Sequence, residues 1–467
     1  MILIKTQNIY SQLSDYDEEL VDKLSVYHKN YWFSSKYKDG LWDGKTNFLK
    51  LQTLKFPTGL LSIVTEHFDE KGIEYEVKEI DDSFEDNIFV IKNSMLSGIQ
   101  LRDYQLSAIH SALNNARGIL QLPTGSGKTE IAVGIIKLLN KKTLYVVHTK
   151  DLLNQTIKRF KQRLDTSSNT LGQIGDGNYF PNDITVATVQ SLNSLFKKDF
   201  EQAKNLLNTF ECLILDECHH ASAQTWYKVA MFCHNASWRF GFSGTPLQRN
   251  ALENMKLQAC TGNLIFKLPT SELIKRKELS EIEVTMVDLS DFPVPLGETW
   301  RQIYRSGIVE NISRNMLIKN IAKKHYIQKD KVMILVREID HGNTLQMMLQ
   351  AEHIPCRFVY GKHKSDYREE SKEEFNESGA FVLIASPIFD EGVDLPEINT
   401  LILAPGGEST VKTLQRVGRG LRKKKDDSVL KVYDFLDQAK YISNHSLQRE
   451  EIYKDEGFPV IRIKIDL

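Results

Sequence analysis

The chain has 467 residues, of which 41% are hydrophobic, and a formal net charge of −1 from 60 basic and 61 acidic side chains. Its length suits about three domains, and its near-neutral charge excludes binding of nucleic acid by a global field, so such binding must use local patches. A mean hydropathy of −0.34 without a long uncharged apolar run argues against a membrane span or a signal peptide. Five scattered cysteines indicate free thiols in a reducing, cytoplasmic compartment.

Residues 1–96 precede the motifs and mix aromatic rings with lysines, and two Asp-Gly pairs, 39–40 and 43–44, indicate tight turns. Rings among cations can stack on bases and hold phosphates, which makes Trp42 and Lys45 candidate nucleic-acid contacts. The alternative is a small domain that buries its rings and solvates its lysines, and we favour it for most of these rings. The rings are Tyr31, Trp32, Phe33, Tyr37, Trp42 and Phe48.

The segment LPTGSGKT, residues 122–129, has the composition of a phosphate-binding loop. It lies between a predicted buried strand, 119–122, and a predicted amphipathic helix, 129–139, and this context disfavours a chance glycine turn. Lys128 would contact the β- and γ-phosphates and Thr129 would bind Mg²⁺, although Leu122 replaces the usual first glycine. The predicted phosphate-binding residues are Pro123, Thr124, Gly125, Ser126, Gly127, Lys128 and Thr129.

The segment LILDECHH, residues 213–220, is an apolar run that ends in two carboxylates. A parallel sheet delivers such groups to its ligand edge, so Asp216 is a candidate Mg²⁺ ligand and Glu217 a candidate general base that also borders the metal. The alternative, a solvated Asp-Glu pair, is disfavoured by the presence of Lys128. We expect no zinc site nearby, because the spacing fits no zinc pattern. The cysteines and histidines concerned are Cys218, His219, His220, Cys233 and His234.

Residues 270–279 predict a helix that opens a second α/β lobe, with Thr270 or Ser271 as its N-cap. Further along, QRVGRGLR, residues 415–422, places Arg419 and Arg422 on one helical face, from which both can reach a γ-phosphate as arginine fingers. The alternative is a basic helix end, which we accept for lysines 423–425.

In this order the motifs resemble those of the superfamily 2 helicases and translocases over residues 102–422. The resemblance implies an α/β fold with two tandem RecA-like parallel-sheet lobes and a small N-terminal α/β domain. It also implies ATP hydrolysis with Mg²⁺ that drives movement along DNA. The expected domains are residues 1–96 for DNA or junction binding, 97–268 for the ATP-binding lobe, 269–440 for the arginine-finger lobe, and 441–467 for a C-terminal tail.

The resemblance also assigns roles to residues that match the family's motifs. The further nucleotide contacts would be Arg102, Gln105, Gly392, Asp394 and Gln415. Contacts to the nucleic-acid backbone, which carry no sequence information, would come from His148, Thr149, Lys150, Gly175, Gly177, Thr188, Gln190, Ser191 and Ser386. Coupling of hydrolysis to movement would use His219, Ser243 and Thr245.

Two segments, residues 37–49 and 56–61, resemble the small N-terminal domain of the UvsW-type branch-migration helicases of phages. This likeness implies Holliday junction branch migration, fork regression, and D-loop or R-loop dissolution in recombination, repair and replication, in the host cytoplasm if the protein is viral. Its partners would be branched or forked DNA and RNA–DNA hybrids, with no membrane. Two alternatives stay open: an RNA or RNA–DNA helicase of the same superfamily, and a non-catalytic ATP-binding nucleic-acid scaffold.

Overall fold

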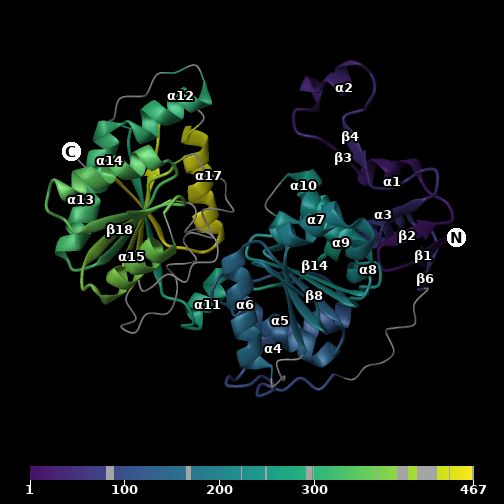
Figure 1. The fold of residues 1–467 in the computed structure, drawn as a ribbon. Helices are drawn as coiled ribbons and strands as arrows, with labels where there is room; N and C mark the ends of the chain where they lie inside the picture. The colour runs from purple at the N-terminus through teal and green to yellow at the C-terminus, as the bar shows by residue number, and fades with distance from the viewer. Residues whose placement is uncertain are drawn as a thin grey trace. The chain divides into compact units, whose positions relative to one another are not determined.

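The computed structural model describes residues 1–79, 89–164, 170–221, 223–247, 250–290, 297, 299–363, 365–386, 398–406, 429–440 and 442–464. The chain divides into two compact units, residues 1–122 with 127–267 and residues 123–126 with 268–467. Each unit contains a mainly parallel sheet with helices packed against it (Figure 1). Within the described residues, we find no helix with the length and apolar character that crossing a membrane requires.

The first unit is built on an eight-stranded sheet that is parallel except at one edge, where β9 and β10 form an antiparallel hairpin. Strands β8 and β12 are buried along their whole length, as expected for parallel strands covered on both faces. In spatial order the strands are β10 (Asn178–Phe180), β9 (Leu171–Gly175), β11 (Ile184–Thr188), β8 (Thr143–Val147), β12 (Cys212–Asp216), β13 (Trp238–Ser243), β7 (Arg117–Gln121) and β14 (Leu264–Lys267).

The helices of this lobe present apolar faces to the sheet. They are α4 (Asp103–Asn115), α5 (Lys128–Leu139), α6 (Lys150–Arg163), α7 (Val189–Lys198), α8 (Phe200–Leu207), η3 (Cys218–His220), α9 (Gln224–Phe232) and α10 (Ala251–Thr261). Because α5 and α6 begin within a few residues of the ends of β7 and β8, their amino ends lie at the carboxyl edge of the sheet.

The N-terminal part of the first unit is a small α/β domain. Its sheet contains, in spatial order, β5 (Lys55–Pro57), β2 (Tyr10–Leu13), β1 (Ile2–Thr6) and β6 (Tyr75–Glu79). Leu20, Phe56, Val64 and Phe68 are fully buried in its core. Its helical segments and separate hairpin are α1 (Glu18–Lys23), η2 (Thr58–Leu60), α3 (Leu61–Lys71), β3 (Ser25–Tyr27), η1 (Tyr31–Phe33), α2 (Ser35–Lys38) and β4 (Lys45–Asn47).

This domain shares its core with the first lobe. Leu252 and Ala259, both on α10, belong to the hydrophobic cluster of the N-terminal domain, and Ile9 belongs to that of the lobe. The backbones meet closely, since a Cβ added to Gly59 would lie 2.1 Å from the carbonyl oxygen of Gln258. The N-terminal domain is therefore held firmly against the first lobe.

The predicted burial of the N-terminal rings is wrong for most of them. Of the six rings only Phe48, 6% exposed, is buried. Tyr31 and Trp42 are half-buried, and Trp32, Phe33 and Tyr37 are 49%, 71% and 38% exposed. The segment that carries these three rings consists of a single 3₁₀ turn and a four-residue helix, which are too short to enclose a core of their own. The predicted turns are confirmed, because Gly40 and Gly44 both have positive φ angles.

The second unit contains a seven-stranded parallel sheet. In spatial order its strands are β17 (Cys356–Val359), β18 (Phe381–Ala385), β16 (Lys331–Leu335), β19 (Thr400–Leu403), β20 (Leu430–Leu436), β15 (Ile282–Asp288) and β21 (Val460–Lys464). The described helices are α11 (Thr270–Lys275), α12 (Trp300–Tyr304), η4 (Arg305–Val309), α13 (Ile312–Ile327), α14 (Ile339–Gln350), α15 (Ser365–Glu377) and α17 (Ile442–Asp455).

Two predictions for this unit need correction. The expected C-terminal tail, residues 441–467, contains α17 and β21, and β21 pairs with β15 as an edge strand of the sheet. Buried Arg449 of α17 also forms a bidentate ion pair with Asp434, at 2.8 Å for both bonds, which ties the helix to β20. Helix α11 begins at Thr270 with Pro269 in the N-cap position and no side-chain cap, so neither Thr270 nor Ser271 is the N-cap.

Candidate nucleotide and nucleic-acid sites

The candidate residues of the first lobe gather at the carboxyl edge of its sheet. Neighbouring strands place Gln121 opposite Ser243 and Phe242 opposite Asp216. On the other side of β12, Val147 lies opposite Thr188. Ligands of open parallel sheets bind at this edge. The phosphate loop, the Asp-Glu pair and the candidate strand contacts therefore follow strands that end along the same edge.

The phosphate loop follows β7 and ends where α5 begins. Gly127 is the N-cap of α5 with φ +79°, and a Cβ added there would lie 2.3 Å from Nε2 of Gln105. The left-handed backbone conformation favours glycine here, and a larger residue would also displace the Gln105 amide. Leu122 is fully buried, and its N–H donates to the carbonyl oxygen of Ser243 at 2.9 Å. Leucine replaces the usual glycine because this position continues the apolar strand.

Lys128 forms an ion pair with Glu217. The Lys128 Nζ to Glu217 Oε1 distance is 2.8 Å, and the side chains are 15% and 27% exposed. Burial disfavours the charged amine, but the carboxylates of Glu217 and Asp216 outweigh it and raise the pKa of Lys128. Burial likewise disfavours the Glu217 carboxylate, but Lys128 and His219 outweigh it and lower the pKa of Glu217. Both partners are thus held in their charged forms.

Asp216 ends β12 and is 8% exposed. Its Oδ1 accepts the N–H of Glu217 at 3.0 Å. Burial, reinforced by the charge of Glu217, raises the pKa of Asp216. Carboxylate and hydroxyl oxygens are the hard ligands that Mg²⁺ prefers, so Asp216 and Thr129 are chemically suited to hold this ion.

Glu217 adopts a strained backbone conformation. Its φ of +48° and ψ of +50° lie in the left-handed region, where non-glycine residues are uncommon, and it begins the turn η3. The turn brings His219 Nδ1 to 3.5 Å from Glu217 Oε2 and to 3.0 Å from Ser243 Oγ. Ser243 Oγ also accepts the N–H of Thr245 at 3.1 Å. The predicted coupling residues therefore form one contact network with Glu217.

A stack of histidines that the sequence did not suggest extends this network. The rings of His148 and His220 are parallel within 7° with centroids 4.3 Å apart, and His219 lies 4.2 Å from His220. Trp226 lies against the same pair at 6.2 Å from His220. Because His148 follows β8 and His220 follows Glu217, the stack joins a candidate strand contact to the Asp-Glu turn.

The other strand-contact candidates lie in caps and turns. Thr149 caps α6 by accepting the N–H of Leu152, and Thr188 caps α7 by accepting the N–H of Ser191. The Thr188 hydroxyl also donates to Ser191 Oγ at 2.8 Å, so the hydroxyls of Thr188 and Ser191 already have local partners. Gln190, between them, is exposed.

The β9–β10 hairpin contributes a second group of candidates. Gly175 and Gly177 flank its turn residue Asp176, and all three have positive φ angles. Lys150 Nζ lies 3.3 Å from an oxygen of Asp176, so this lysine is fixed beside the hairpin. The carboxyl edge of β9 thus adds backbone amides and a cation next to the α6 cap.

The predicted adenine segment begins α4. Gln105 is 5% exposed, and its Oε1 accepts the N–H of Arg102 at 2.9 Å, which forms a capping box. Arg102 Nη1 donates to the hydroxyl of Tyr104 at 2.9 Å. The Gln105 amide that would recognise the adenine base thus also caps the amino end of α4, beside Gly127.

The N-terminal candidates Trp42 and Lys45 make internal contacts. Trp42 Nε1 donates to the carbonyl oxygen of Lys45 at 2.8 Å. Lys45 Nζ lies 3.0 Å from Asp22 and 4.9 Å from the ring centroid of Tyr27. Both residues help to fix the β3–β4 hairpin, and the more exposed rings lie elsewhere on it.

Of the predicted site residues that follow residue 268, only one can be placed. Ser386 follows β18, is 6% exposed, and its N–H donates to the carbonyl oxygen of Val359 at 3.0 Å. The other five lie outside the described residues: Gly392, Asp394, Gln415, Arg419 and Arg422.

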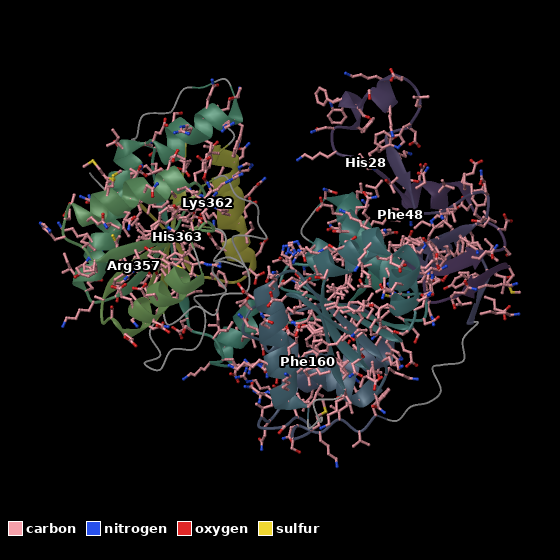
Figure 2. All side chains as sticks on the ribbon, viewed as in Figure 1. His28, Phe48, Phe160, Arg357, Lys362 and His363 are labelled. Atoms are coloured by element: carbon pink, nitrogen blue, oxygen red, sulfur yellow. The ribbon has the colours of Figure 1, made fainter. Side chains whose placement is uncertain are left out.

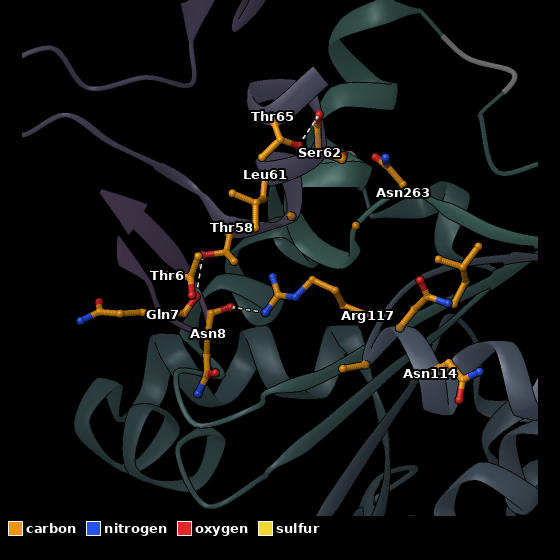
Figure 3. A pocket seen from close by; sticks show the side chains of 15 residues that line it. Thr6, Gln7, Asn8, Thr58, Leu61, Ser62, Thr65, Asn114, Arg117 and Asn263 are labelled. Atoms are coloured by element: carbon orange, nitrogen blue, oxygen red, sulfur yellow. Dashed lines mark hydrogen bonds between the residues drawn. The ribbon is translucent and has the colours of Figure 1, made fainter. Parts of the chain in front are cut away.

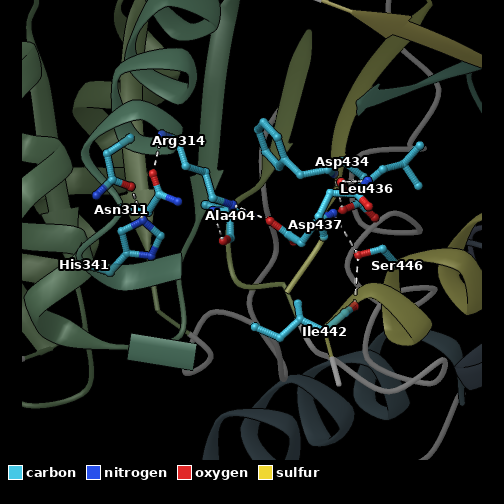
Figure 4. A network of polar contacts seen from close by, with 12 residues as sticks. Asn311, Arg314, His341, Ala404, Asp434, Leu436, Asp437, Ile442 and Ser446 are labelled. Atoms are coloured by element: carbon cyan, nitrogen blue, oxygen red, sulfur yellow. Dashed lines mark hydrogen bonds and ion pairs between the residues drawn. The ribbon is translucent and has the colours of Figure 1, made fainter. Parts of the chain in front are cut away.

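A buried polar network that sequence reasoning missed surrounds Arg314 on α13 (Figure 4). Arg314 Nε donates to Asp437 Oδ1 at 2.8 Å, and its Nη1 donates to the carbonyl oxygen of Ala404 at 2.8 Å. Next to it, His341 Nε2 lies 2.9 Å from Asn315 Oδ1. Arg314 therefore joins the two described segments, 398–406 and 429–440, that flank the predicted arginine fingers.

A cavity of about 590 Å³ lies between the N-terminal domain and the first lobe (Figure 3). Apart from Arg117, its polar lining is uncharged, and Arg117 Nη2 donates to the carbonyl oxygen of Asn8 at 2.9 Å. Arg117 begins β7, whereas the phosphate loop follows its end. The cavity therefore lies at the opposite edge of the sheet from the candidate nucleotide site.

Comparison with known proteins identifies two domains. Residues 98–248 match the family described as type III restriction enzyme, res subunit, and residues 313–424 match the helicase conserved C-terminal domain. The DNA 3'-5' translocase XPB2 of Sulfurisphaera tokodaii is 29% identical over 442 residues, covering 86% of this chain and 94% of that protein. The solved structure of S. cerevisiae Dbp5 with RNA and ADP BeF3 shares the fold, with a TM-score of 0.54 and 16% identity over 78% of this chain and 94% of that one.

These tandem domains define the class: the chain resembles the superfamily 2 helicases, and it is an ATP-dependent DNA helicase. Among its relatives is the ATP-dependent DNA helicase uvsW of Enterobacteria phage T4, 24% identical over 490 residues that cover 96% of this chain and 95% of that protein. The chain resembles that helicase over nearly its whole length. The predicted fold of two parallel-sheet lobes with a small N-terminal α/β domain is confirmed. Because the chain is an ATP-dependent helicase, the alternative of a non-catalytic scaffold is excluded.

Proposed function

We propose that this helicase uses ATP to remodel branched DNA, by migrating Holliday junctions, regressing forks and dissolving D-loops or R-loops, in recombination, repair and replication. The observation that carries the proposal is the shared core of the N-terminal domain and the first lobe, through Leu252, Ala259 and Ile9. A domain held in this way moves together with the lobe, so a branch bound to it keeps a fixed position relative to the nucleotide site as the lobe advances along the adjoining duplex. A host cytoplasm is the matching location if the protein is viral, like the T4 relative.

Hydrolysis begins, in this proposal, with an exchange of partners at Lys128. The incoming β- and γ-phosphates take Lys128 from Glu217, and backbone N–H groups of the glycine-rich loop surround them. Glu217 Oε1 is then free to accept a proton from the attacking water, as a general base must. In this proposal, contact of Lys128 with the phosphates thus releases Glu217 to act as the base.

The remaining nucleotide contacts orient the substrate. Thr129 and Asp216 are the residues that would hold Mg²⁺, which neutralises charge on the phosphates when bound. Gln105 and Arg102 would recognise the adenine, since an amide can both donate and accept a hydrogen bond. Arg419 and Arg422 would stabilise the charge that develops on the transferred phosphoryl group, with Gln415, Gly392 and Asp394 beside them.

Coupling to DNA runs, in this proposal, through the contacts around Glu217. His219, Ser243 and Thr245 connect the Asp-Glu turn with the end of β13, and the His148–His220 stack connects it with the start of α6. Backbone phosphates would be gripped at the caps and turns of Thr149, Lys150, Gly175, Gly177, Thr188, Gln190 and Ser191, and by Ser386. These contacts leave recognition of DNA shape to the N-terminal domain.

The test is stimulation of ATP hydrolysis by different nucleic acids at fixed ionic strength. We expect a four-way junction or a fork to stimulate more strongly than plain duplex, and single-stranded RNA to stimulate least. Lys128→Ala should abolish hydrolysis while DNA binding persists, which controls for a contaminating ATPase. Stimulation that is greatest with RNA would instead favour an RNA helicase, and equal stimulation by branched and plain DNA would contradict the proposal.

A further inference from the structure

The β3–β4 hairpin and the segment it encloses, residues 25–47, form what we call the aromatic finger. Tyr27, Trp32, Phe33 and Tyr37 are 53%, 49%, 71% and 38% exposed, and neighbouring Leu41 is 79% exposed. Figure 2 shows His28 within this hairpin and Phe48 at its base, where the chain re-enters the buried core. A solvent-exposed surface with this many large apolar side chains usually marks a binding site.

The rings of the finger are held in place rather than loosely attached. Tyr31 stacks on Tyr27 with centroids 4.8 Å apart, and it meets Trp32 and Tyr37 edge-on at 5.2 and 4.7 Å. A Cβ added to Gly44 would lie 2.4 Å from Tyr31 Cδ2, so only glycine permits this arrangement. Because Tyr31 anchors the group, Trp32 and Phe33 are presented to solvent in a preformed geometry.

The finger also carries cationic side chains. The finger contains four lysines and two aspartates. Lys45 is paired with Asp22, but in the described part of the chain no carboxylate lies within ion-pair distance of Lys29, Lys36 or Lys38. These three lysines are exposed. Flat rings among unpaired ammonium groups complement a ligand with aromatic faces and negative charges, which is the chemistry of unstacked bases on a phosphate backbone.

We propose that the aromatic finger binds unpaired bases at the branch point of DNA, with Trp32 and Phe33 stacking on bases and Lys29, Lys36 and Lys38 contacting the flanking phosphates. This inference rests on the proposed remodelling of branched DNA and adds the residues that recognise the branch. A fully paired duplex offers no free base faces along its length, so the finger distinguishes a branch from plain duplex. Because the N-terminal domain shares its core with the first lobe, the finger keeps a fixed position relative to the nucleotide site.

The test compares two double variants of the full-length protein. Trp32→Leu with Phe33→Leu keeps apolar bulk but removes the flat rings, whereas Trp32→Phe with Phe33→Tyr keeps them. Since stacking contributes about 1–3 kcal/mol per base, loss of one stacked base weakens binding about 5- to 150-fold. We expect the leucine variant, which loses both rings, to lose at least this much affinity for a four-way junction, and the aromatic variant to bind within about twofold of wild type.

A 2-aminopurine base placed at the branch point gives a direct readout, because its fluorescence reports base stacking. Wild type and the aromatic variant should change this fluorescence on binding, and the leucine variant should not. Tyr16→Ala is the matched control, because Tyr16 is a 37% exposed ring of the same domain outside the finger, and it should behave as wild type.

The outcomes separate this inference from the proposed function. If the leucine variant binds the junction and alters the fluorescence as wild type does, the finger does not stack on bases, and its rings contact a protein surface instead. If wild type itself treats the junction and plain duplex alike, the proposed remodelling of branched DNA fails first. ATP hydrolysis without nucleic acid, and its stimulation by plain duplex, should be unchanged in all finger variants, which shows that they fold.

Discussion

Glu217→Gln tests the partner exchange at Lys128. The substitution keeps the shape of the side chain but removes its charge and its ability to accept a proton. Without the negative partner, Lys128 no longer has to leave an ion pair when the phosphates arrive. We therefore expect two opposite effects, a large loss of turnover and a modest gain in nucleotide affinity.

The structure sets the size of both effects. The 2.8 Å pair, with side chains 15% and 27% exposed, lies between a surface ion pair of about 0.2–1 kcal/mol and a sheltered charged hydrogen bond of about 1.5–3 kcal/mol. A value near 1 kcal/mol corresponds to about fivefold tighter ATP binding. General base catalysis contributes about 10²- to 10⁴-fold to the rate, and the turnover number should fall by that amount.

The assay pairs steady-state ATP hydrolysis with calorimetric titration of ATP. Glu211→Gln is the matched control, because it breaks the 3.1 Å ion pair with Lys141 on the surface of the same lobe and should change neither quantity. Unchanged turnover in Glu217→Gln would show that Glu217 is not the base. Nucleotide binding that weakens tenfold would show that Glu217 contributes to holding ATP, which would refute the exchange.

Three other variants test separate parts of the account. Arg422→Ala should lower the turnover number at least about 10³-fold with little change in ATP affinity, because the finger acts in the transition state, and an equal loss of both in hydrolysis and titration assays would refute it. His220→Ala should abolish the stimulation of ATP hydrolysis by DNA but leave the basal rate within about twofold. His220→Phe, which keeps a flat ring, should retain the stimulation. Unaltered stimulation in His220→Ala would contradict coupling through the stack. Burial, reinforced by Arg314, lowers the pKa of His341 to about 3 from 6.5, so its contribution to stability is complete above pH 6.5 and falls by about 1.4 kcal/mol per pH unit as the pH drops towards 3. His341→Asn should flatten this decline in thermal unfolding scans, and an unchanged slope would show that another group causes it.

The sequence predicts those parts of the molecule that depend on short segments. The loop at residues 122–129 and the carboxylates at 216 and 217 lie beside strands whose apolar runs are legible in the sequence, and parallel pairing then brings their carboxyl ends to one edge. Leu122 looked like a departure from the motif, and its complete burial explains it. The tandem lobes follow from the same alternation of strands and helices.

Features that depend on distant contacts could not be predicted in this way. The His148–His220 stack forms because the ends of β8 and β12 become neighbours in the sheet, and no local sequence pattern predicts that these two strands pair. The exposure of Trp32 and Phe33 depends on the lack of a second layer over the finger, which the composition does not reveal. The sequence predicts only a tail where β21 lies, because the partner of this strand, β15, is far away in the sequence.

The most direct test of the central claim is conversion of a labelled four-way junction, followed by gel electrophoresis, beside a replication fork, an RNA–DNA hybrid and a plain duplex. The account predicts that wild type converts the junction and the fork only when ATP and Mg²⁺ are present, and that Glu217→Gln binds both without converting them. Conversion of the plain duplex at the same rate as the junction, or of RNA–DNA hybrids alone, would contradict it.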